Sequence, residues 1–385
     1  MAWIIPENKL DIKQRDVISC NHKQNLCITG FARTGKRIAL CCLMRKIMLS
    51  EPNARCTILV YNNLNVNIYR SAFHELGLYL EVTTYYKFKK SNHNYDYIFC
   101  INIQNISSET LIDIKNRSKY VIVTMDPYIT LYEVDPLTNQ KTLAISDVDK
   151  ILTPQIFELY HSPHCDSTMQ RIVSNIIKPS SPPFHLICDS FKTVRTQIRL
   201  CKGINEEEEF LYIIREAKRS LECGYSNAIL LPTNNMILSF IQKILSLEGK
   251  CPWSVQTNTW GKINFLSLNQ HLEKNMIPFQ CLGNTFGQIG DCQNKTSILT
   301  YHSSQGLHFD EVFIPNMNTN LFINPNEHIG RNALALAITR FDCSLYITYN
   351  GILHRYLSGI ETNCINIDIH EVLTTPPTEN VFAGI

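Results

Sequence analysis

The segment GFARTGKR at residues 30–37 has the spacing in this chain that best suits phosphate chemistry. Its pattern, G-x-x-x-x-G-K, is that of a loop in which backbone N–H groups and the lysine hold phosphate. Gly30, Thr34, Gly35 and Lys36 are therefore candidate phosphate-binding residues. The next position normally carries a hydroxyl that holds Mg²⁺, but here it is Arg37, whose guanidinium has donors and no acceptor. The loop suits an anion better than its metal, and Arg37 could itself pair with phosphate.

The residues on either side of this loop predict the elements that a phosphate-binding loop requires. Residues 25–29 read as a short buried strand, and residues 38–44 are apolar nearly all round, as in a helix packed against a sheet. The alternative is a chance match in an ordinary turn. Strand, loop and helix in this order favour the phosphate-binding interpretation.

Further strands and helices alternate along the whole chain, which predicts an α/β protein with mainly parallel sheets. Strands are expected at residues 57–61, 97–101, 120–124, 228–232, 297–301, 311–315 and 344–349, and those at 97–101 and 120–124 have the apolar run of buried parallel strands. Helices are expected at residues 63–76, 206–221, 236–247 and 331–339. We expect two tandem domains, residues 1–155 and 156–385, with a hinge within residues 152–160.

Composition sets limits on the class of protein. The length of 385 residues allows two domains with their own cores, and the net charge of +2 excludes a generally basic surface, so a nucleic-acid site would be a local groove. No apolar run is long enough for a membrane helix and no signal peptide opens the chain, so we expect a cytoplasmic protein without a membrane partner. The 15 cysteines lack a C-x-x-C pair. His161, His164 and Cys165 could hold a metal, but a surface turn explains them as well, and we predict no metal site there.

Taken in order, the motifs resemble those of superfamily 1 helicases of the UvrD and Rep type. The resemblance covers almost the whole chain and implies two tandem RecA-like P-loop NTPase domains. The large accessory insertion domains are expected to be absent because the intervals between motifs are short. The matching positions are Gln14, residues 30–36, 60–64 and 95–105, Asp126 and Pro127 with Tyr132, and residues 160–162, 300–309 and 337–340.

The resemblance implies roles for individual residues. Gln14 would read adenine, Tyr160 would stack on it, Lys36 would hold phosphate, and Arg340 would act as an arginine finger. Single-stranded DNA would be bound through Tyr61, Asn62, Thr300 and His302, although ordinary packing at strand ends is the alternative for these four. The segment YYKFKK at residues 85–90 is a further local basic and aromatic candidate, with a solvated edge as its alternative.

Several positions depart from the family pattern, and each concerns phosphoryl transfer. The metal-holding Asp is replaced by Ile101, the water-orienting Glu by Asn102, and the γ-phosphate Gln by Ile129. Further replacements are Arg37, His161, Gln305 and His308. ATP binding is therefore expected to be feasible, Mg²⁺ binding doubtful and efficient hydrolysis absent, so no catalytic residue is assigned. The alternative is an empty cleft in which Arg37 pairs with a protein carboxylate.

Three functions are compatible with these residues. The first is a hydrolysis-impaired helicase-fold subunit that binds nucleotide or single-stranded DNA in a nucleic-acid-processing complex, in DNA repair or anti-phage defence, beside a nuclease or helicase partner. The second is an active ATP-dependent DNA helicase or translocase with unusual ligands. The third is a protein-interaction scaffold that binds neither ligand. No cluster of acidic residues indicates a nuclease in this chain itself.

Overall fold

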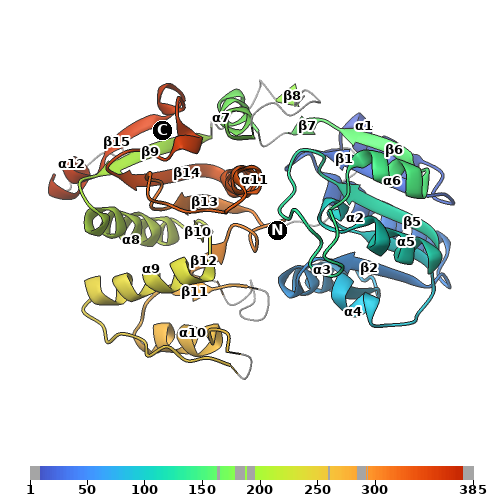
Figure 1. Ribbon diagram of the computed structural model, residues 1–385, viewed down its shortest axis with the longest axis horizontal. Coiled ribbons are helices and arrows are strands. Elements are labelled where there is room, and N and C mark those ends of the chain that lie inside the picture. The colour runs from blue at the N-terminus through green and yellow to red at the C-terminus, as the bar shows by residue number, and fades with distance from the viewer. Residues whose placement is uncertain are drawn as a thin grey trace. The chain divides into compact units, whose positions relative to one another are not determined.

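The chain folds into two compact units (Figure 1). The computed structural model describes residues 9–162, 165–177, 196–258, 261–283, 292 and 294–375, together with the backbone of residues 187–188. The first unit comprises Met1–Thr193, Leu282–Ile289 and Asn324–Thr339, and the second comprises Val194–Cys281, Gly290–Ile323 and Arg340–Ile385. The first unit thus extends beyond residue 155, where the sequence places a domain boundary. His164 lies outside the described residues.

A six-stranded sheet forms the centre of the first unit, with the order β3-β2-β4-β5-β1-β6 and every neighbouring pair parallel. Its strands are β1 (Leu26–Gly30), β2 (Cys56–Val60), β3 (Glu81–Thr84), β4 (Tyr95–Cys100), β5 (Ser118–Met125) and β6 (Gln155–Leu159). Because the strands are parallel, the loops that follow β1, β2, β4, β5 and β6 leave the sheet at the same edge. This edge carries the phosphate loop.

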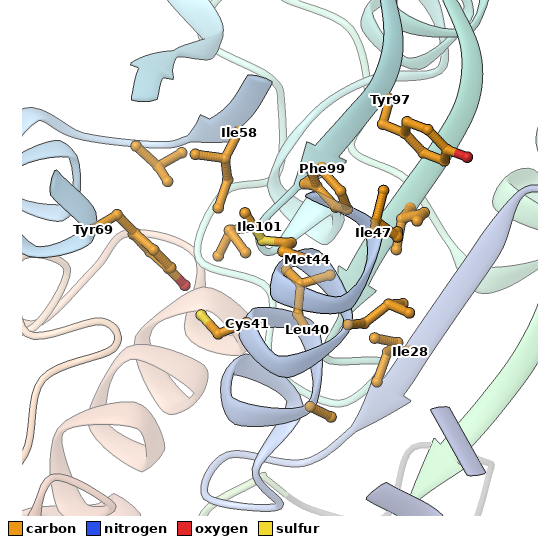
Figure 2. Packing of buried hydrophobic residues seen from close by; sticks show 14 of the residues in the cluster. Ile28, Leu40, Cys41, Met44, Ile47, Ile58, Tyr69, Tyr97, Phe99 and Ile101 are labelled. Atoms are coloured by element: carbon orange, nitrogen blue, oxygen red, sulfur yellow. The ribbon is translucent and has the colours of Figure 1, made fainter. Parts of the chain in front are cut away.

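Alternate residues of the strands enter two separate hydrophobic cores, one on each face of this sheet. Ile28 and Phe99 belong to the first core, together with the helices α2 (Lys36–Ser50) and α3 (Asn63–Glu75). Cys27 and Ile98 belong to the second core, together with α4 (Tyr85–Lys89), α5 (Ser108–Asn116) and α6 (Ile145–Leu152). Figure 2 shows the first core, in which side chains of α2 and α3 meet those of the strands. Burial on both faces explains why the inner strands β4 and β5 are largely apolar in sequence.

Three helices of the first unit begin at polar side chains that satisfy one of their free N–H groups. Asn62 caps α3, Thr84 caps α4 and Ser107 caps α5, each accepting from the backbone N–H three residues later. The helices are α1 (Ile12–Ser19), α2 (Lys36–Ser50), α3 (Asn63–Glu75), α4 (Tyr85–Lys89), α5 (Ser108–Asn116), α6 (Ile145–Leu152), α7 (Ser167–Ile177) and α11 (Glu327–Ile338). Helices α7 and α11 pack together, and Nη1 of Arg331 on α11 donates to the carbonyl of Ile176 on α7 at 3.2 Å.

The second unit contains a seven-stranded parallel sheet with the order β11-β12-β10-β13-β14-β9-β15. Its strands are β9 (Gln197–Gly203), β10 (Asn227–Leu231), β11 (Phe279–Cys281), β12 (Thr296–Thr300), β13 (Phe309–Ile314), β14 (Phe341–Asn350) and β15 (Ile365–Asp368). Its helices are α8 (Glu206–Glu222), α9 (Asn234–Leu247), α10 (Phe265–Lys274) and α12 (Ile369–Thr374). In Figure 1, α8 runs along this sheet, and it contacts β9, β10, β12 and β14.

The predicted α/β class with two mainly parallel sheets is confirmed. The hinge expected within residues 152–160 is wrong, because residues 155–159 form β6, which pairs with β1 along its whole length. None of the described helices combines the length and the apolar character needed to cross a membrane.

Candidate nucleotide site

The phosphate loop, residues 30–37, joins the end of β1 to the start of α2 and needs glycine at two points. Gly30 has φ +150°, and a Cβ there would lie 2.3 Å from the carbonyl oxygen of Leu159 on the neighbouring strand β6. Gly35 is left-handed, with φ +80°, and a Cβ would lie 2.2 Å from Nε2 of Gln14. Both glycines are therefore fixed by close contacts as well as by backbone conformation.

Lys36 holds its ammonium group against the backbone of the loop. Its Nζ donates to the carbonyl oxygens of Gly30 at 2.6 Å and Phe31 at 2.7 Å. Thr34 is fully buried and its hydroxyl donates to the same Phe31 carbonyl at 2.8 Å. These bonds place a positive charge at the N-terminus of α2, where the helix dipole also favours an anion. The structure thus gives the predicted loop an organised shape around the lysine.

Gln14 supports this loop from α1. Its Nε2 donates to the Thr34 carbonyl at 3.2 Å, while its Oε1 accepts from the backbone N–H of Asp11 at 3.1 Å. The carboxylate of Asp11 in turn accepts from the backbone N–H of Gln14 at 2.8 Å, which completes a capping box at the start of α1. Gln14 therefore makes structural contacts at the position expected to read adenine, and its role toward adenine stays a prediction.

The segment that follows β6 flanks the loop on the other side. Ser162 donates its hydroxyl to the Arg33 carbonyl at 3.2 Å, and Nδ1 of His161 lies 3.7 Å from a carboxylate oxygen of Asp11. Tyr160 is half-buried and sits between β6 and these contacts. The fold therefore brings Tyr160, Gln14 and the loop to one edge of the first sheet. Asp11, Arg33 and Ser162 also contribute contacts to this edge. Nothing in the sequence indicated these contacts except that the three residues lie near motif residues.

Arg37 occupies the place of the metal-binding hydroxyl in the first turn of α2. It is half-buried, and its guanidinium carbon lies 5.3 Å from the centre of the Tyr69 ring on α3. An aromatic face attracts a cation at this distance. Burial is the main cause that raises the pKa of Tyr69 above its usual value, so this ring stays neutral beside the cation.

Ile101 and Ile129 are the two apolar residues among the positions that depart from the expected motifs, and both are buried. Ile101 follows β4 and packs in the first core near Met44 and Phe99 (Figure 2). Ile129 follows β5, and its backbone N–H donates to the carboxylate of Asp126 at 3.1 Å. These apolar side chains supply neither a metal ligand nor a contact to a phosphate.

A polar network joins the loops that follow β4 and β5. Gln104 is buried, accepts from the backbone N–H of Asp126 at 3.2 Å and donates to the Ile129 carbonyl at 3.3 Å. Asn102 has a left-handed backbone, and its N–H donates to the hydroxyl of Thr124 at 3.0 Å. The network fixes the loop backbone at the edge beside β1, although the acidic residue expected in this motif is missing.

The two predicted nucleic-acid residues of the first unit have structural partners. Tyr61 stacks on Tyr132 with ring centroids 5.0 Å apart, and burial raises the pKa of Tyr132 to about 12. Asn62 caps α3 by accepting from the backbone N–H of Asn65 at 2.8 Å. In the segment at residues 85–90, Tyr85 and Phe88 are buried in the second core, which leaves Tyr86 as its exposed ring. Tyr61, Tyr85 and Phe88 therefore pack within the first unit, and Asn62 caps a helix.

The predicted residues of the second unit lie near the ends of its strands. Thr300 ends β12, and its hydroxyl accepts from the backbone N–H of Ser303 at 3.1 Å. His302 is half-buried in the turn that follows. Arg340 precedes β14, is buried, and donates from Nη1 to the Leu307 carbonyl at 3.4 Å. Within its own unit, Arg340 thus helps to hold the turn after β12.

The second unit also contains a buried carboxylate and a pocket that the sequence analysis missed. Glu209 of α8 is buried and accepts from the backbone N–H of Asn316 at 2.5 Å, the hydroxyl of Thr348 at 2.6 Å and the amide of Asn350 at 2.7 Å. It is one of four successive acidic residues in the first turn of α8, a pattern typical of a solvated helix start. The neighbouring pocket, of about 540 Å³, is lined by α8, α9 and Asn316 and has Phe240 among its apolar side chains.

No group of three or more His, Cys, Asp and Glu side chains suited to a metal ion occurs in the described part of the chain. Cys165 is buried, and His161 lies near Asp11. The third residue of the sequence candidate, His164, is outside the described residues.

Comparison with known proteins gives only distant structural likenesses. No protein-family model matches the sequence, and a search of curated proteins finds no match. One similar solved structure is the C-terminal domain of a possible DNA helicase from Lactobacillus plantarum WCFS1, with 12% identity, a TM-score of 0.34, and coverage of 53% of this chain and 98% of that one. The Arterivirus nonstructural protein 10 helicase has 11% identity, a TM-score of 0.44, and coverage of 91% of this chain and 63% of that one. The PRRSV helicase has 11% identity, a TM-score of 0.43, and coverage of 87% of this chain and 54% of that one. These values assign no role to any residue.

Proposed function

We propose that this chain is a helicase-fold protein of two RecA-like units that binds a nucleotide at the phosphate loop and hydrolyses it poorly. The observation that carries the proposal is the joint arrangement of Lys36 and Ile101. Lys36 is held over an organised loop at the N-terminus of α2, which suits phosphate binding. At the end of β4, where hydrolysis needs a carboxylate, Ile101 is packed in the core.

The nucleotide site would comprise Gln14, Gly30, Thr34, Gly35, Lys36, Arg37 and Tyr160, with Arg340 remaining a prediction from the resemblance. Poor hydrolysis follows from the loss of groups that stabilise charge in the transition state. A chain that binds nucleotide and turns it over slowly suits a subunit of a nucleic-acid-processing complex, such as one with a nuclease or helicase partner in DNA repair or anti-phage defence.

An ATPase assay with single-stranded DNA, run beside the Lys36→Ala variant, tests this function. We expect binding of ATP, seen as a rise in melting temperature that the variant loses, because a ligand bound only by the native state stabilises it. We also expect turnover no higher than that of the variant. DNA-stimulated turnover that depends on Lys36 would instead show an active translocase.

The binding of single-stranded DNA through Tyr61, Asn62, Thr300 and His302 is the less supported half of the proposal. Tyr61 stacks on Tyr132 and Asn62 caps α3, so both side chains make contacts within the protein itself. These contacts favour the scaffold alternative. Fluorescence anisotropy with a labelled oligothymidine separates the two. Binding that Tyr61→Leu and His302→Ala weaken would support the DNA site, and no binding at low salt would favour the scaffold.

A further inference from the structure

The positions that would hold Mg²⁺ at the phosphate loop do not have the chemistry for it. Mg²⁺ requires oxygen ligands in near-octahedral geometry. A P-loop supplies a hydroxyl after the lysine and a carboxylate from the end of another strand of the same sheet. Here the first position is Arg37, which has no acceptor atom, and the second is Ile101, which is 5% exposed and belongs to the apolar core. The donor set therefore does not fit this metal.

Another acidic residue at the same edge is Asp126, which follows β5. Strand β5 pairs with β1, so Asp126 leaves the sheet beside the phosphate loop. Its Oδ1 accepts from the backbone N–H groups of Tyr128 at 3.0 Å and Ile129 at 3.1 Å. This carboxylate thus shapes its own turn, and the described residues hold no cluster that would join it in binding a metal.

Positive charge is instead built into the loop itself. Residues 30–37 contain Arg33, Lys36 and Arg37 and no acidic residue. Lys36 is fixed by two loop carbonyls, and the Arg37 guanidinium is held against Tyr69 of the adjacent helix. A guanidinium is always charged at neutral pH and matches phosphate oxygens with two parallel donors. A cation held on a neighbouring ring loses less conformational freedom on binding than a free surface arginine.

We propose that the phosphate loop binds phosphates without a divalent cation, with Arg37 providing the charge that Mg²⁺ would otherwise supply. The ligand class is a nucleoside diphosphate or triphosphate, or inorganic pyrophosphate. The inference rests on the proposed nucleotide site and adds that phosphate binding there does not require a metal ion. It also explains why the hydroxyl and the carboxylate are replaced together, since each is needed only if the metal is bound.

Isothermal titration of ADP and of pyrophosphate into the full chain, in MgCl₂ and in EDTA, tests this inference. We expect binding in EDTA to be at least as tight as in MgCl₂, because Arg37 and Ile101 offer the metal no oxygen ligand and Mg²⁺ complexed by the free ligand competes with Arg37 for the phosphate oxygens. Arg37→Thr should weaken binding in EDTA about tenfold, as loss of one charge-assisted contact does. Arg45→Thr is the matched control, since it removes an arginine from an exposed position two turns further along α2, and it should leave binding unchanged.

The outcomes separate the inference from the function on which it rests. Binding that EDTA weakens tenfold or more overturns the inference and leaves the nucleotide site intact. If Asp126→Asn then abolishes the effect of EDTA on binding, Asp126 is the carboxylate that holds the metal. Equal binding by Arg37→Thr and the unaltered chain in EDTA overturns it as well. No binding of either ligand in either buffer, by a chain that melts cooperatively, overturns the proposed nucleotide site itself.

Discussion

Substitution of Gly35 by alanine tests the contact between the phosphate loop and α1. The new methyl group meets two obstacles. A non-glycine residue in the left-handed region costs about 1–2 kcal/mol. In addition, the Cβ would lie 2.2 Å from Gln14 Nε2, so the Gln14 side chain must move and lose its hydrogen bond to the Thr34 carbonyl. A net hydrogen bond contributes about 1 kcal/mol, so the free energy of unfolding should fall by about 2–3 kcal/mol in total.

Two further variants isolate the part that comes from Gln14. Gly77→Ala is the matched control, since Gly77 also has a positive φ of +64° but no atom within 4 Å of an added Cβ. It should show the backbone cost alone. In a Gln14→Ala background, Gly35→Ala should likewise cost only this amount, which gives a coupling of about 1 kcal/mol between the two positions.

Hydrogen exchange along a urea gradient, read on peptides from β1 and α2, measures these differences without assuming that both units unfold together. The reasoning fails if Gly35→Ala costs no more than Gly77→Ala. It also fails if the coupling with Gln14→Ala is below about 0.3 kcal/mol, the range in which independent sites add.

Three further variants test buried contacts in the two units. Asp135 is buried and accepts from the N–H and the hydroxyl of Ser107, so Asp135→Ala should lower the free energy of unfolding by about 3 kcal/mol in urea titration, because these donors lose their partner; a loss below 1 kcal/mol would contradict this. Tyr61→Leu should cost about 1 kcal/mol through the lost stack on Tyr132, and an unchanged midpoint would show that the stack contributes nothing. Burial raises the pKa of Glu209 above its ordinary 4.5, so the folded state holds this proton more tightly and stability falls as pH rises from about 4.5 through the raised pKa. Glu209→Gln should remove that part of the slope in melting curves across this range, and an identical pH profile would refute the assignment.

Much of the fold follows from the sequence because buried parallel strands have an unambiguous pattern. Residues 120–123 are apolar, and they lie within β5 with both faces covered. The pattern failed at β6, an edge strand whose residues 155 and 156 are exposed. With one neighbour and partial burial, such a strand has the mixed composition of a linker.

The candidate site was predictable in its motif positions and not in its contacts. Spacing alone identified Lys36 and the two glycines, since local backbone geometry requires them. The bond from Gln14 to the Thr34 carbonyl joins residues 20 positions apart and has no local signature. Glu209 was missed for a related reason, because a helix-start pattern does not reveal which of four acidic side chains turns inward.

The pairing of β6 with β1 has a consequence for how the protein is made. The hydroxyl of Ser162 reaches the Arg33 carbonyl across 129 residues, so a chain emerging from the ribosome has completed β1, α2 and β5 long before the flank of its phosphate loop exists. Contacts of such separation form late and slowly. Until then, one side of β1 is an unpaired strand edge, and such an edge exposes the nascent chain to aggregation.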